Sequence, residues 1–179
     1  GATGFIGANL ARRLLNDGFE VHASIRPSSD TWRLKDIIKK IHAHNTDITD
    51  KENLSKTLKQ ARPDYIFHLA AYGAYPRQQS DEKKIIETNF GGMQNLLDAS
   101  FDIDYKCLVN TGSSSEYGVK NKPMKETDTL EPNMPYAVAK ACATMLCSHF
   151  ARAYQKPVIT LRPFSAYGYY EESFRLIPD

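Results

Sequence analysis

Apolar and β-branched runs alternate with amphipathic helical patterns along the chain, and this alternation is typical of βαβ units with a parallel sheet. The apolar runs predict strands at Glu20 to Arg26, Ile41 to Asn45, Tyr65 to Leu69, Tyr105 to Thr111 and Val158 to Arg162. The patterns between them predict helices at Phe5 to Asn16, Asp30 to Lys39, Lys51 to Gln60, Glu82 to Phe101 and Pro135 to Gln155. We therefore expect an α/β fold with a doubly wound parallel sheet.

A glycine-rich loop opens the chain, and its sequence Gly1-Ala-Thr-Gly4-Phe5-Ile6-Gly7 leads directly into the first helical pattern. The glycines suit a turn that passes close to a ligand. The free N–H groups and the positive dipole end of the helix suit a pyrophosphate. A glycine triplet alone is weakly specific, because glycine also serves ordinary turns.

Such a loop normally follows a buried strand, but the sequence starts at Gly1. We therefore expect residues 1–179 to be a Rossmann-type dinucleotide-binding domain that is truncated at both ends. Its sheet would have the order 3-2-1-4-5-6, with the first, central strand missing and the C-terminal substrate domain absent. An apolar strand of about five residues contributes about 5–10 kcal/mol, which is comparable to the net stability of a whole domain. The chain alone is expected to fold poorly and to be inactive.

Composition narrows the possible partners. A chain of 179 residues with 41% hydrophobic content can bury one core, and its net charge of +2 offers no basic stripe for nucleic acid. Three cysteines without metal-ligand spacing indicate a reducing cytoplasm and no metal site. No apolar run reaches the length of a membrane span, so we expect no membrane partner.

Tyr136 and Lys140 form the most informative pair in the sequence, because residues four apart share one face of a helix. A lysine ammonium beside a phenol stabilises the phenolate. A unit charge at about 4 Å in an effective dielectric of about 20 supplies roughly 4 kcal/mol, which is an upper figure of about three pKa units. Such a tyrosine exchanges protons at neutral pH, although the same spacing also occurs on ordinary half-exposed helices.

These motifs, taken in order, resemble the extended short-chain dehydrogenase/reductase superfamily, in its NAD-dependent epimerase/dehydratase branch that acts on nucleotide sugars. The resemblance covers nearly the whole chain. Besides the glycine loop and the Tyr136/Lys140 pair, it includes Asp47-Ile48, His68-Leu69-Ala70-Ala71, Asn89, the run Ser113 to Gly118 and the run Leu161 to Gly168.

The resemblance implies which residues contact the cofactor. Asp47 is similar to the family's acceptor for the adenine edge, with Ile48 against the ring; the alternative, a helix N-cap, is better served by Thr49 or Asp50. For Asn89, bracing of the neighbouring strands and an ordinary satisfied helix asparagine stay equally open. The implied cofactor-binding set is Gly1, Gly4, Phe5, Ile6, Gly7, Arg26, Asp47, Ile48, Leu69, Ala70, Ala71, Asn89, Tyr136, Lys140, Pro163, Phe164 and Ser165.

The strand predicted at Glu20 to Arg26, which is the second strand of the complete fold, indicates which cofactor is preferred. An NAD-binding fold usually places an acidic residue at the end of this strand, but this chain has Ile25 followed by Arg26. An arginine can bind a 2′-phosphate with both arms of its guanidinium. We favour NADP(H), with NAD(H) as the alternative, since an arginine at this position is also compatible with plain surface.

The resemblance assigns the chemistry to Ser113, Tyr136 and Lys140. Counting back from Tyr117-Gly118 places the family's catalytic Ser/Thr at Ser113, whose hydroxyl would bind the substrate oxygen. The 4,6-dehydratases of this family carry acidic residues directly after that position, where this chain has Ser114 and Ser115. Glu116 would fill this role only if the count slips by one residue.

We therefore expect reduction of a 4-keto nucleotide sugar, with a 4-epimerase that retains NAD as the first alternative. Two further alternatives are a non-catalytic NADP(H) sensor and an NADPH-dependent reductase of non-sugar carbonyls. Tyr72, Arg77 and Ser114 are candidate substrate contacts, and surface polarity explains Arg77 equally well. The family also implies a homodimer of the full-length protein, built on the fourth and fifth predicted helices.

Overall fold

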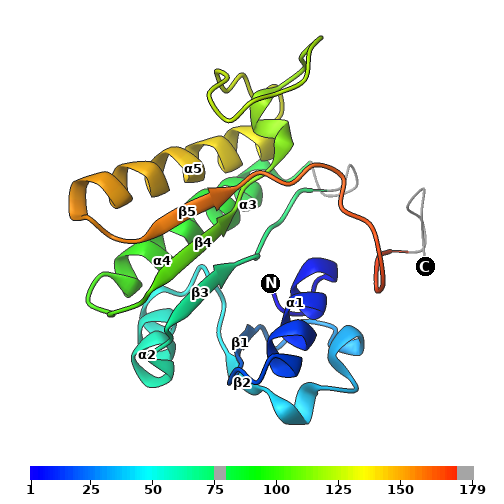
Figure 1. Ribbon diagram of the computed structural model, residues 1–179, viewed down its shortest axis with the longest axis vertical. Coiled ribbons are helices and arrows are strands. Elements are labelled where there is room, and N and C mark those ends of the chain that lie inside the picture. The colour runs from blue at the N-terminus through cyan, green and yellow to red at the C-terminus, as the bar shows by residue number, and fades with distance from the viewer. Residues whose placement is uncertain (75–79, 173–179) are drawn as a thin grey trace.

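The strands pair in parallel and form two separate sheets (Figure 1). This computed structural model describes residues 1–74 and 80–172. The first sheet contains β1 (His22–Ile25) and β2 (His42–Asn45), and the second contains β3 (Tyr65–His68), β4 (Cys107–Thr111) and β5 (Val158–Leu161). Each predicted strand is confirmed, and no strand end differs from the prediction by more than two residues.

The strand order agrees with the doubly wound arrangement. Strand β1 pairs with β2, and β3, β4 and β5 lie in that order. These two sets correspond to positions 3-2 and 4-5-6 of the predicted order, on either side of its first position. The predicted α/β fold with parallel pairing is confirmed.

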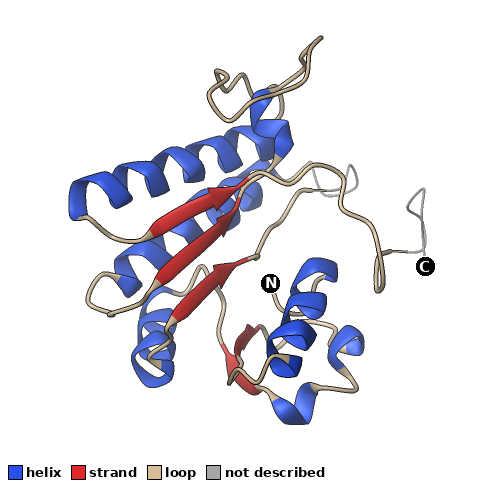
Figure 2. Cartoon of the chain, viewed as in Figure 1, coloured by secondary structure: helices blue, strands red, loops and turns tan. Residues whose placement is uncertain are grey.

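Four of the predicted helices form where the apolar periodicity placed them (Figure 2). They are α1 (Phe5–Asn16), α2 (Lys51–Ala61), the helical stretch from Glu82 to Ser100, and α5 (Pro135–Tyr154). Sequence chemistry explains the ends of α2 and α5. Asp50 caps α2 by accepting from Asn53 N at 3.0 Å, and Pro135 lies in the first turn of α5, where its missing N–H costs nothing.

The long helix predicted from Glu82 to Phe101 contains a π turn. It consists of α3 (Glu82–Ile86), the π turn Glu87–Gly91 and α4 (Gly92–Ser100). Asn89 lies in this turn, is fully buried and donates from Nδ2 to Ile85 O at 2.9 Å and to Tyr72 O at 2.7 Å. The π turn therefore coincides with the residue that ties this helix to the segment after β3.

The helix predicted from Asp30 to Lys39 is wrong. Two short 3₁₀ turns, Trp32–Leu34 and Ile38–Lys40, occupy this segment. Arg12 Nη2 donates to Arg33 O at 2.6 Å, while Ile37 N donates to Leu34 O at 2.9 Å. Ile37 N thus bonds three residues back, in the 3₁₀ pattern, while Arg33 O accepts from the side chain of Arg12 on another element.

Two hydrophobic clusters support the two sheets. One lies between α1, β1 and the 3₁₀ segment, with Ala8, Val21 and Leu34 at its centre. The larger one joins one face of β3, β4 and β5 to α2, α4 and α5, and its fully buried side chains include Met93 and Leu108. Each cluster thus stabilises its own part of the fold.

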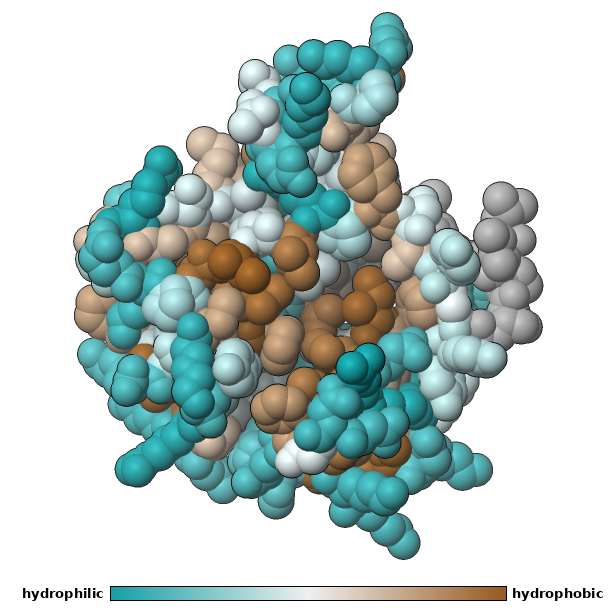
Figure 3. Space-filling view, viewed as in Figure 1, coloured by the Kyte–Doolittle hydropathy of each residue, from teal (hydrophilic) through white to brown (hydrophobic). Residues whose placement is uncertain are grey.

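The opposite face of the second sheet is apolar and partly exposed. Its exposed side chains are Tyr65, Phe67, Ile159 and Leu161. Figure 3 shows hydrophobic residues gathered at the centre of this view, over the strands and next to α1. Among residues 1–74 and 80–172, no helix is both long and apolar enough to cross a membrane.

The segment after β5 returns to the first helix and connects the two parts. Asn9 donates to Tyr169 O at 2.8 Å, and Arg33 donates to Tyr170 O at 2.7 Å. Arg33 also forms an ion pair with Glu172 at 3.0 Å. Residues near both ends of the described chain therefore lie side by side.

Candidate active site

The predicted site residues lie at or just beyond the carboxyl ends of the parallel strands. Arg26 follows β1, Asp47 comes two residues after β2, Leu69 follows β3, Ser113 comes two residues after β4, and Pro163 comes two residues after β5. The carboxyl ends of parallel strands meet at one edge of a sheet, which is where α/β folds bind ligands. The fold therefore brings these residues to a common edge.

The glycine loop is packed directly against the segment that follows β3. A Cβ atom on Gly1 would lie 2.2 Å from the carbonyl carbon of Leu69 and 2.6 Å from Ala70 N. A Cβ atom on Gly7 would lie 2.1 Å from Gly1 O. Real Cβ atoms do not approach this closely, so both positions require glycine. Gly1, Leu69 and Ala70 therefore lie side by side, and their contact with a cofactor stays a prediction.

The start of α1 fits a dinucleotide pyrophosphate. Gly4 is the N-cap and offers no side-chain hydrogen bond, and the first turn has no acidic side chain. Phe5 and Ile6 are the first two residues of this helix; Phe5 is half-buried and Ile6 is 39% exposed. The N–H groups of the first turn keep their dipole directed at the loop, where a phosphate would be bound.

Arg26 and Asp47 line one shallow surface pocket together with Lys84 and Thr88. Burial disfavours the charge on Asp47, but hydrogen bonds from Thr49 N and Oγ1 and the charge of Arg26 outweigh this and lower the pKa of Asp47. Asp47 does not cap α2, because Asp50 does. The role of Asp47 as an adenine acceptor remains a prediction.

The other predicted cofactor contacts near this pocket have mixed surroundings. Ile48 packs on the larger core cluster, and a Cβ atom on Gly92 would lie 2.9 Å from its Cγ1. Ala70 is half-buried and Ala71 is exposed. Asn89 is fully buried, and its Oδ1 accepts from Tyr72 N at 3.3 Å. Asn89 therefore braces the segment after β3, which agrees with the first of the two interpretations of this residue.

Ser113 caps the 3₁₀ turn Ser114–Tyr117 that follows β4. Its Oγ lies 2.6 Å from Ser115 Oγ and accepts from Ser115 N at 3.2 Å. Ser114 N donates to Pro163 O at 3.1 Å. Ser114 and Ser115 thus have structural contacts that hold the Ser113 hydroxyl in place.

Glu116 is fully buried and neutralised by Arg162. Glu116 Oε1 accepts from Ser113 N at 2.7 Å, and Oε2 accepts from Arg162 Nε at 2.9 Å. Arg162 also donates to Tyr117 OH at 2.9 Å. Both carboxylate oxygens are occupied within the protein. Glu116 therefore acts as a structural anchor for the segment from Gly112 to Tyr117, which we call the serine loop.

Helix α5 places Tyr136 in its first turn and Lys140 one turn later, and α5 packs against the turn that Ser113 caps. Lys140 is 2% exposed and its Nζ donates to Thr111 O, the carbonyl at the end of β4. Burial lowers the pKa of Lys140 to about 8, although the charge of Glu116 opposes the shift. A buried lysine therefore ties α5 to the carbonyl of Thr111, two residues before Ser113.

His68, the last residue of β3, is also buried, and burial together with the charge of Lys140 holds the pKa of His68 well below its ordinary value. Its burial thus disfavours the charged form of the ring, and we assign it no catalytic role.

The remaining predicted contacts are less enclosed. Phe164 is 61% exposed, Ser165 is exposed and Pro163 is half-buried. Tyr72 is half-buried, and Lys84 Nζ lies 4.5 Å from the centre of its ring. Arg77 lies outside the described residues.

The sequence interpretation missed the roles of Glu116, Arg162, Tyr117 and the Thr111 carbonyl. The sequence contains one indication of this ion pair. Glu116 is the charged residue in the otherwise uncharged run Ser113 to Tyr117, and Arg162 directly follows the last strand. The pairing itself depends on the alignment of β4 with β5, in which Thr111 pairs with Leu161.

The profile of the NAD dependent epimerase/dehydratase family matches residues 1–179. The chain belongs to this family. A UDP-glucose 4-epimerase from Lacticaseibacillus casei is 30% identical over 169 residues, which are 94% of this chain and 50% of that protein. The chain therefore spans about half the length of the curated relatives it matches.

Two solved members of the epimerase/dehydratase family extend the comparison. A dTDP-glucose 4,6-dehydratase from Streptomyces venezuelae, solved with NAD, has a TM-score of 0.88 and 28% identity over 99% of this chain and 58% of its own. A UDP-glucose 4-epimerase from Brucella ovis, in complex with NAD, has a TM-score of 0.83 and 27% identity over 92% of this chain and 50% of its own. The resemblance to nucleotide-sugar epimerases and dehydratases is confirmed, whereas the preference for NADP(H) stays a prediction.

Proposed function

We propose that the protein reduces the 4-keto group of a nucleotide-diphospho sugar by hydride transfer, with Tyr136 as the acid/base. The enclosure of Glu116, whose two carboxylate oxygens are occupied by Ser113 N and Arg162, supports chemistry at C4 over dehydration, and Arg26 in the pocket of Asp47 supports reduction over epimerisation. Dehydration needs an acidic side chain beside the catalytic serine, and the next two residues after Ser113 are serines. Chemistry at C4 needs only the serine, the tyrosine and the lysine.

When bound, the nicotinamide cofactor supplies or accepts the hydride. The protein's own groups then manage the proton and the charge at the C4 oxygen. Tyr136 donates a proton to this oxygen in reduction and removes it in oxidation. The Ser113 hydroxyl donates a hydrogen bond to the same oxygen while negative charge develops there. The buried ammonium of Lys140 favours the ionised form of the phenol.

Arg26 supports NADP(H) as the cofactor. It is exposed at the end of β1 and lines the same pocket as Asp47, the proposed adenine contact. No acidic residue takes the place at the strand end that a ribose 2′-hydroxyl prefers, because Ile25 is the last residue of β1. A guanidinium at this position matches a 2′-phosphate.

A 4-epimerase with retained NAD is the second candidate, and it is supported by a different observation. The UDP-glucose 4-epimerases among the relatives match 94% of this chain, and the one from Brucella ovis was solved with NAD. An epimerase oxidises and then reduces the same carbon, so it consumes no cofactor, whereas a reductase consumes one NADPH per turnover.

Cofactor stoichiometry in the full-length protein distinguishes these candidates. The reductase is supported if added NADPH is oxidised in proportion to a 4-keto nucleotide sugar, and if Arg26→Ala weakens NADPH binding at least tenfold more than NADH binding. NAD that co-purifies and is never consumed, together with interconversion of UDP-glucose and UDP-galactose, would support the epimerase.

The Tyr136→Phe variant tests the chemistry common to both candidates. It removes only the hydroxyl, so cofactor binding should persist while turnover falls by at least about a hundredfold. Undiminished turnover would refute the role of Tyr136. Cofactor binding without turnover on any nucleotide sugar, in the wild type, would instead indicate a sensor.

We also propose that the full-length protein is a homodimer that buries the outer faces of the stretch from Glu82 to Ser100 and of α5. Ile86, Val138 and Met145 are exposed on these helices, with exposed fractions of 41%, 39% and 65%. Light scattering after size exclusion should give twice the monomer mass, and Met145→Glu should shift the protein to monomer.

A further inference from the structure

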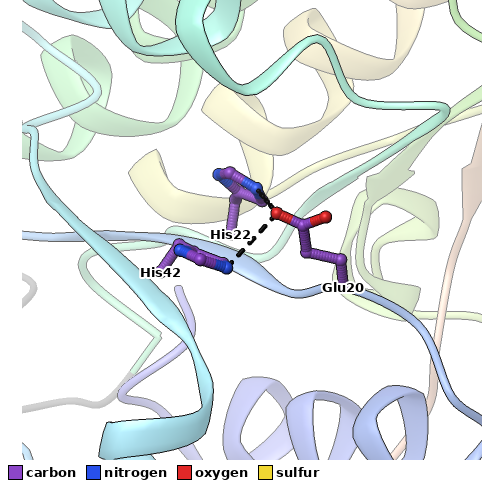
Figure 4. Close-up of side chains that lie close together, drawn as sticks. All are labelled: Glu20, His22 and His42. Carbon is purple, nitrogen blue, oxygen red and sulfur yellow. Dashed lines mark hydrogen bonds and ion pairs between the residues drawn. The ribbon is translucent and has the colours of Figure 1, made fainter.

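Three side chains with metal-binding chemistry converge outside the predicted active site, at the amino-terminal ends of β1 and β2 (Figure 4). His22 is the first residue of β1, His42 is the first residue of β2, and the parallel register pairs them. Glu20 precedes His22 by two residues. Glu20 Oε1 lies 2.9 Å from His22 Nε2 and 3.2 Å from His42 Nε2.

The distances between these atoms fit the ligand shell of a tetrahedral metal ion. Two ligand atoms that each lie about 2.0–2.1 Å from Zn²⁺ at a tetrahedral angle are about 3.3 Å apart. The two oxygen-to-nitrogen distances in the structure are within a few tenths of an ångström of this value. All three donor atoms lie within 4.8 Å of one another.

A fourth residue orients the central ligand. His44 Nε2 lies 2.9 Å from His22 Nδ1, and the two rings stack with centroids 5.1 Å apart. When His22 Nδ1–H donates to His44, the lone pair of His22 Nε2 faces Glu20 and His42. Histidines that bind metals commonly hold their second N–H in such a hydrogen bond, which fixes the tautomer. The arrangement thus includes a supporting partner as well as ligands.

We propose that Glu20, His22 and His42 bind a divalent transition-metal ion, for which Zn²⁺ is the best match. Two imidazoles and one carboxylate suit Zn²⁺, and water would take the fourth position. The Glu20 and His42 side chains are 68% and 59% exposed and His22 is 25% exposed, so an ion can reach the site from solvent.

The location of the site indicates what the ion does. Arg26 and Asp47 lie at the carboxyl ends of the same two strands, whereas the three ligands lie at their amino ends. The ion would therefore join β1 to β2 at the edge opposite the cofactor. We infer a structural clip on the dinucleotide-binding half, which raises stability and leaves hydride transfer unchanged.

Zinc titration of the full-length protein, without an affinity tag, tests the proposal. Competition with a chromophoric chelator at pH 7.5 should reveal one Zn²⁺ site, and Co²⁺ should give the visible absorption of a tetrahedral complex. His42→Gln and Glu20→Gln should each weaken Zn²⁺ binding at least tenfold. His44→Gln, which removes only the supporting partner, should weaken it about ten- to a hundredfold.

His149→Gln is the matched control, because His149 is exposed on α5 and outside the cluster. This variant should bind Zn²⁺ like the wild type, and both should gain thermal stability from Zn²⁺ while His42→Gln gains none. Equal Zn²⁺ affinity of His42→Gln and wild type would overturn the proposal, and so would the absence of a Zn²⁺ site in the wild type. If Glu20→Gln fails to fold by circular dichroism, His42→Gln, at a largely exposed position, still decides the question.

Discussion

Replacing Glu116 with glutamine separates its structural role from any role in proton transfer. The substitution keeps the size of the side chain but removes a charge that is 0% exposed and 2.9 Å from Arg162 Nε. Removal of one partner from a buried ion pair costs about 3–5 kcal/mol. Arg162 keeps the Tyr117 hydroxyl as a partner and its side chain is 18% exposed, which places the cost near the lower end, at about 3 kcal/mol.

Equilibrium urea unfolding of the full-length protein measures this cost. The Glu116→Gln variant should lose about 3 kcal/mol of unfolding free energy, whereas the control Glu126→Gln, at an exposed position of the following loop, should stay within about 0.5 kcal/mol of the wild type. Turnover should fall about a hundredfold, because Ser113 N loses its charged acceptor and the serine shifts.

A double variant tests the reasoning further. Glu116→Leu combined with Arg162→Met leaves neither charge buried, so it should recover most of the lost stability while turnover stays low. A loss below about 1 kcal/mol in Glu116→Gln would refute the buried ion pair as the anchor of the loop. Dehydratase activity that disappears in Glu116→Gln while stability is unchanged would make Glu116 an acid/base instead.

Three further predictions follow from the fold. Burial lowers the pKa of Lys140 from 10.5 to about 8, so the unfolded chain binds more protons than the folded chain between these two pH values. The unfolding free energy should therefore rise with pH across this window by up to about 3 kcal/mol. Urea unfolding at pH 7.5 and 10 measures the rise, which Lys140→Met should abolish. Gly7→Ala should weaken cofactor binding at least tenfold in a fluorescence titration, because the new Cβ atom would lie 2.1 Å from Gly1 O. Gly91→Ala is the control and should bind the cofactor normally, because its Cβ atom would have no neighbour closer than 4.0 Å. Tight binding by Gly7→Ala would contradict the packing of the loop. Residues 1–179 expressed alone should not unfold in one cooperative step, since the two sheets have separate cores. The fluorescence of the single tryptophan, Trp32, and far-ultraviolet circular dichroism should therefore report different unfolding transitions. One coincident, cooperative unfolding transition would disprove this.

The sequence predicted the regular elements well because their apolar periodicity is strong. The limits of α1 agree with the prediction at both ends, and the strands differ only at their termini. The failure at Asp30 to Lys39 has a tertiary cause. Arg12, on another element, takes the carbonyl of Arg33, and local periodicity contains no information about that contact.

The candidate site was predicted unevenly for a similar reason. Tyr136 and Lys140 were proposed from their spacing on a helix, and Ser113 from its place in a motif that resembles the family's, so all three needed only local sequence. The Glu116–Arg162 pair and the cluster of Glu20, His22 and His42 join segments that are far apart in sequence. Such contacts depend on strand register, and a shift of one residue would separate His22 from His42.

The hydrogen bonds between the serine loop and the exit of β5 restrict how descendants of this protein can change. Gly112 N donates to Leu161 O at 2.6 Å and Ser114 N donates to Pro163 O at 3.1 Å, so the two segments form one rigid unit. A mutation in either segment that accommodated a new sugar would also move the Ser113 hydroxyl, the proposed partner of the proton donor Tyr136. We expect evolution of new specificities to leave this unit intact and to proceed through side chains elsewhere.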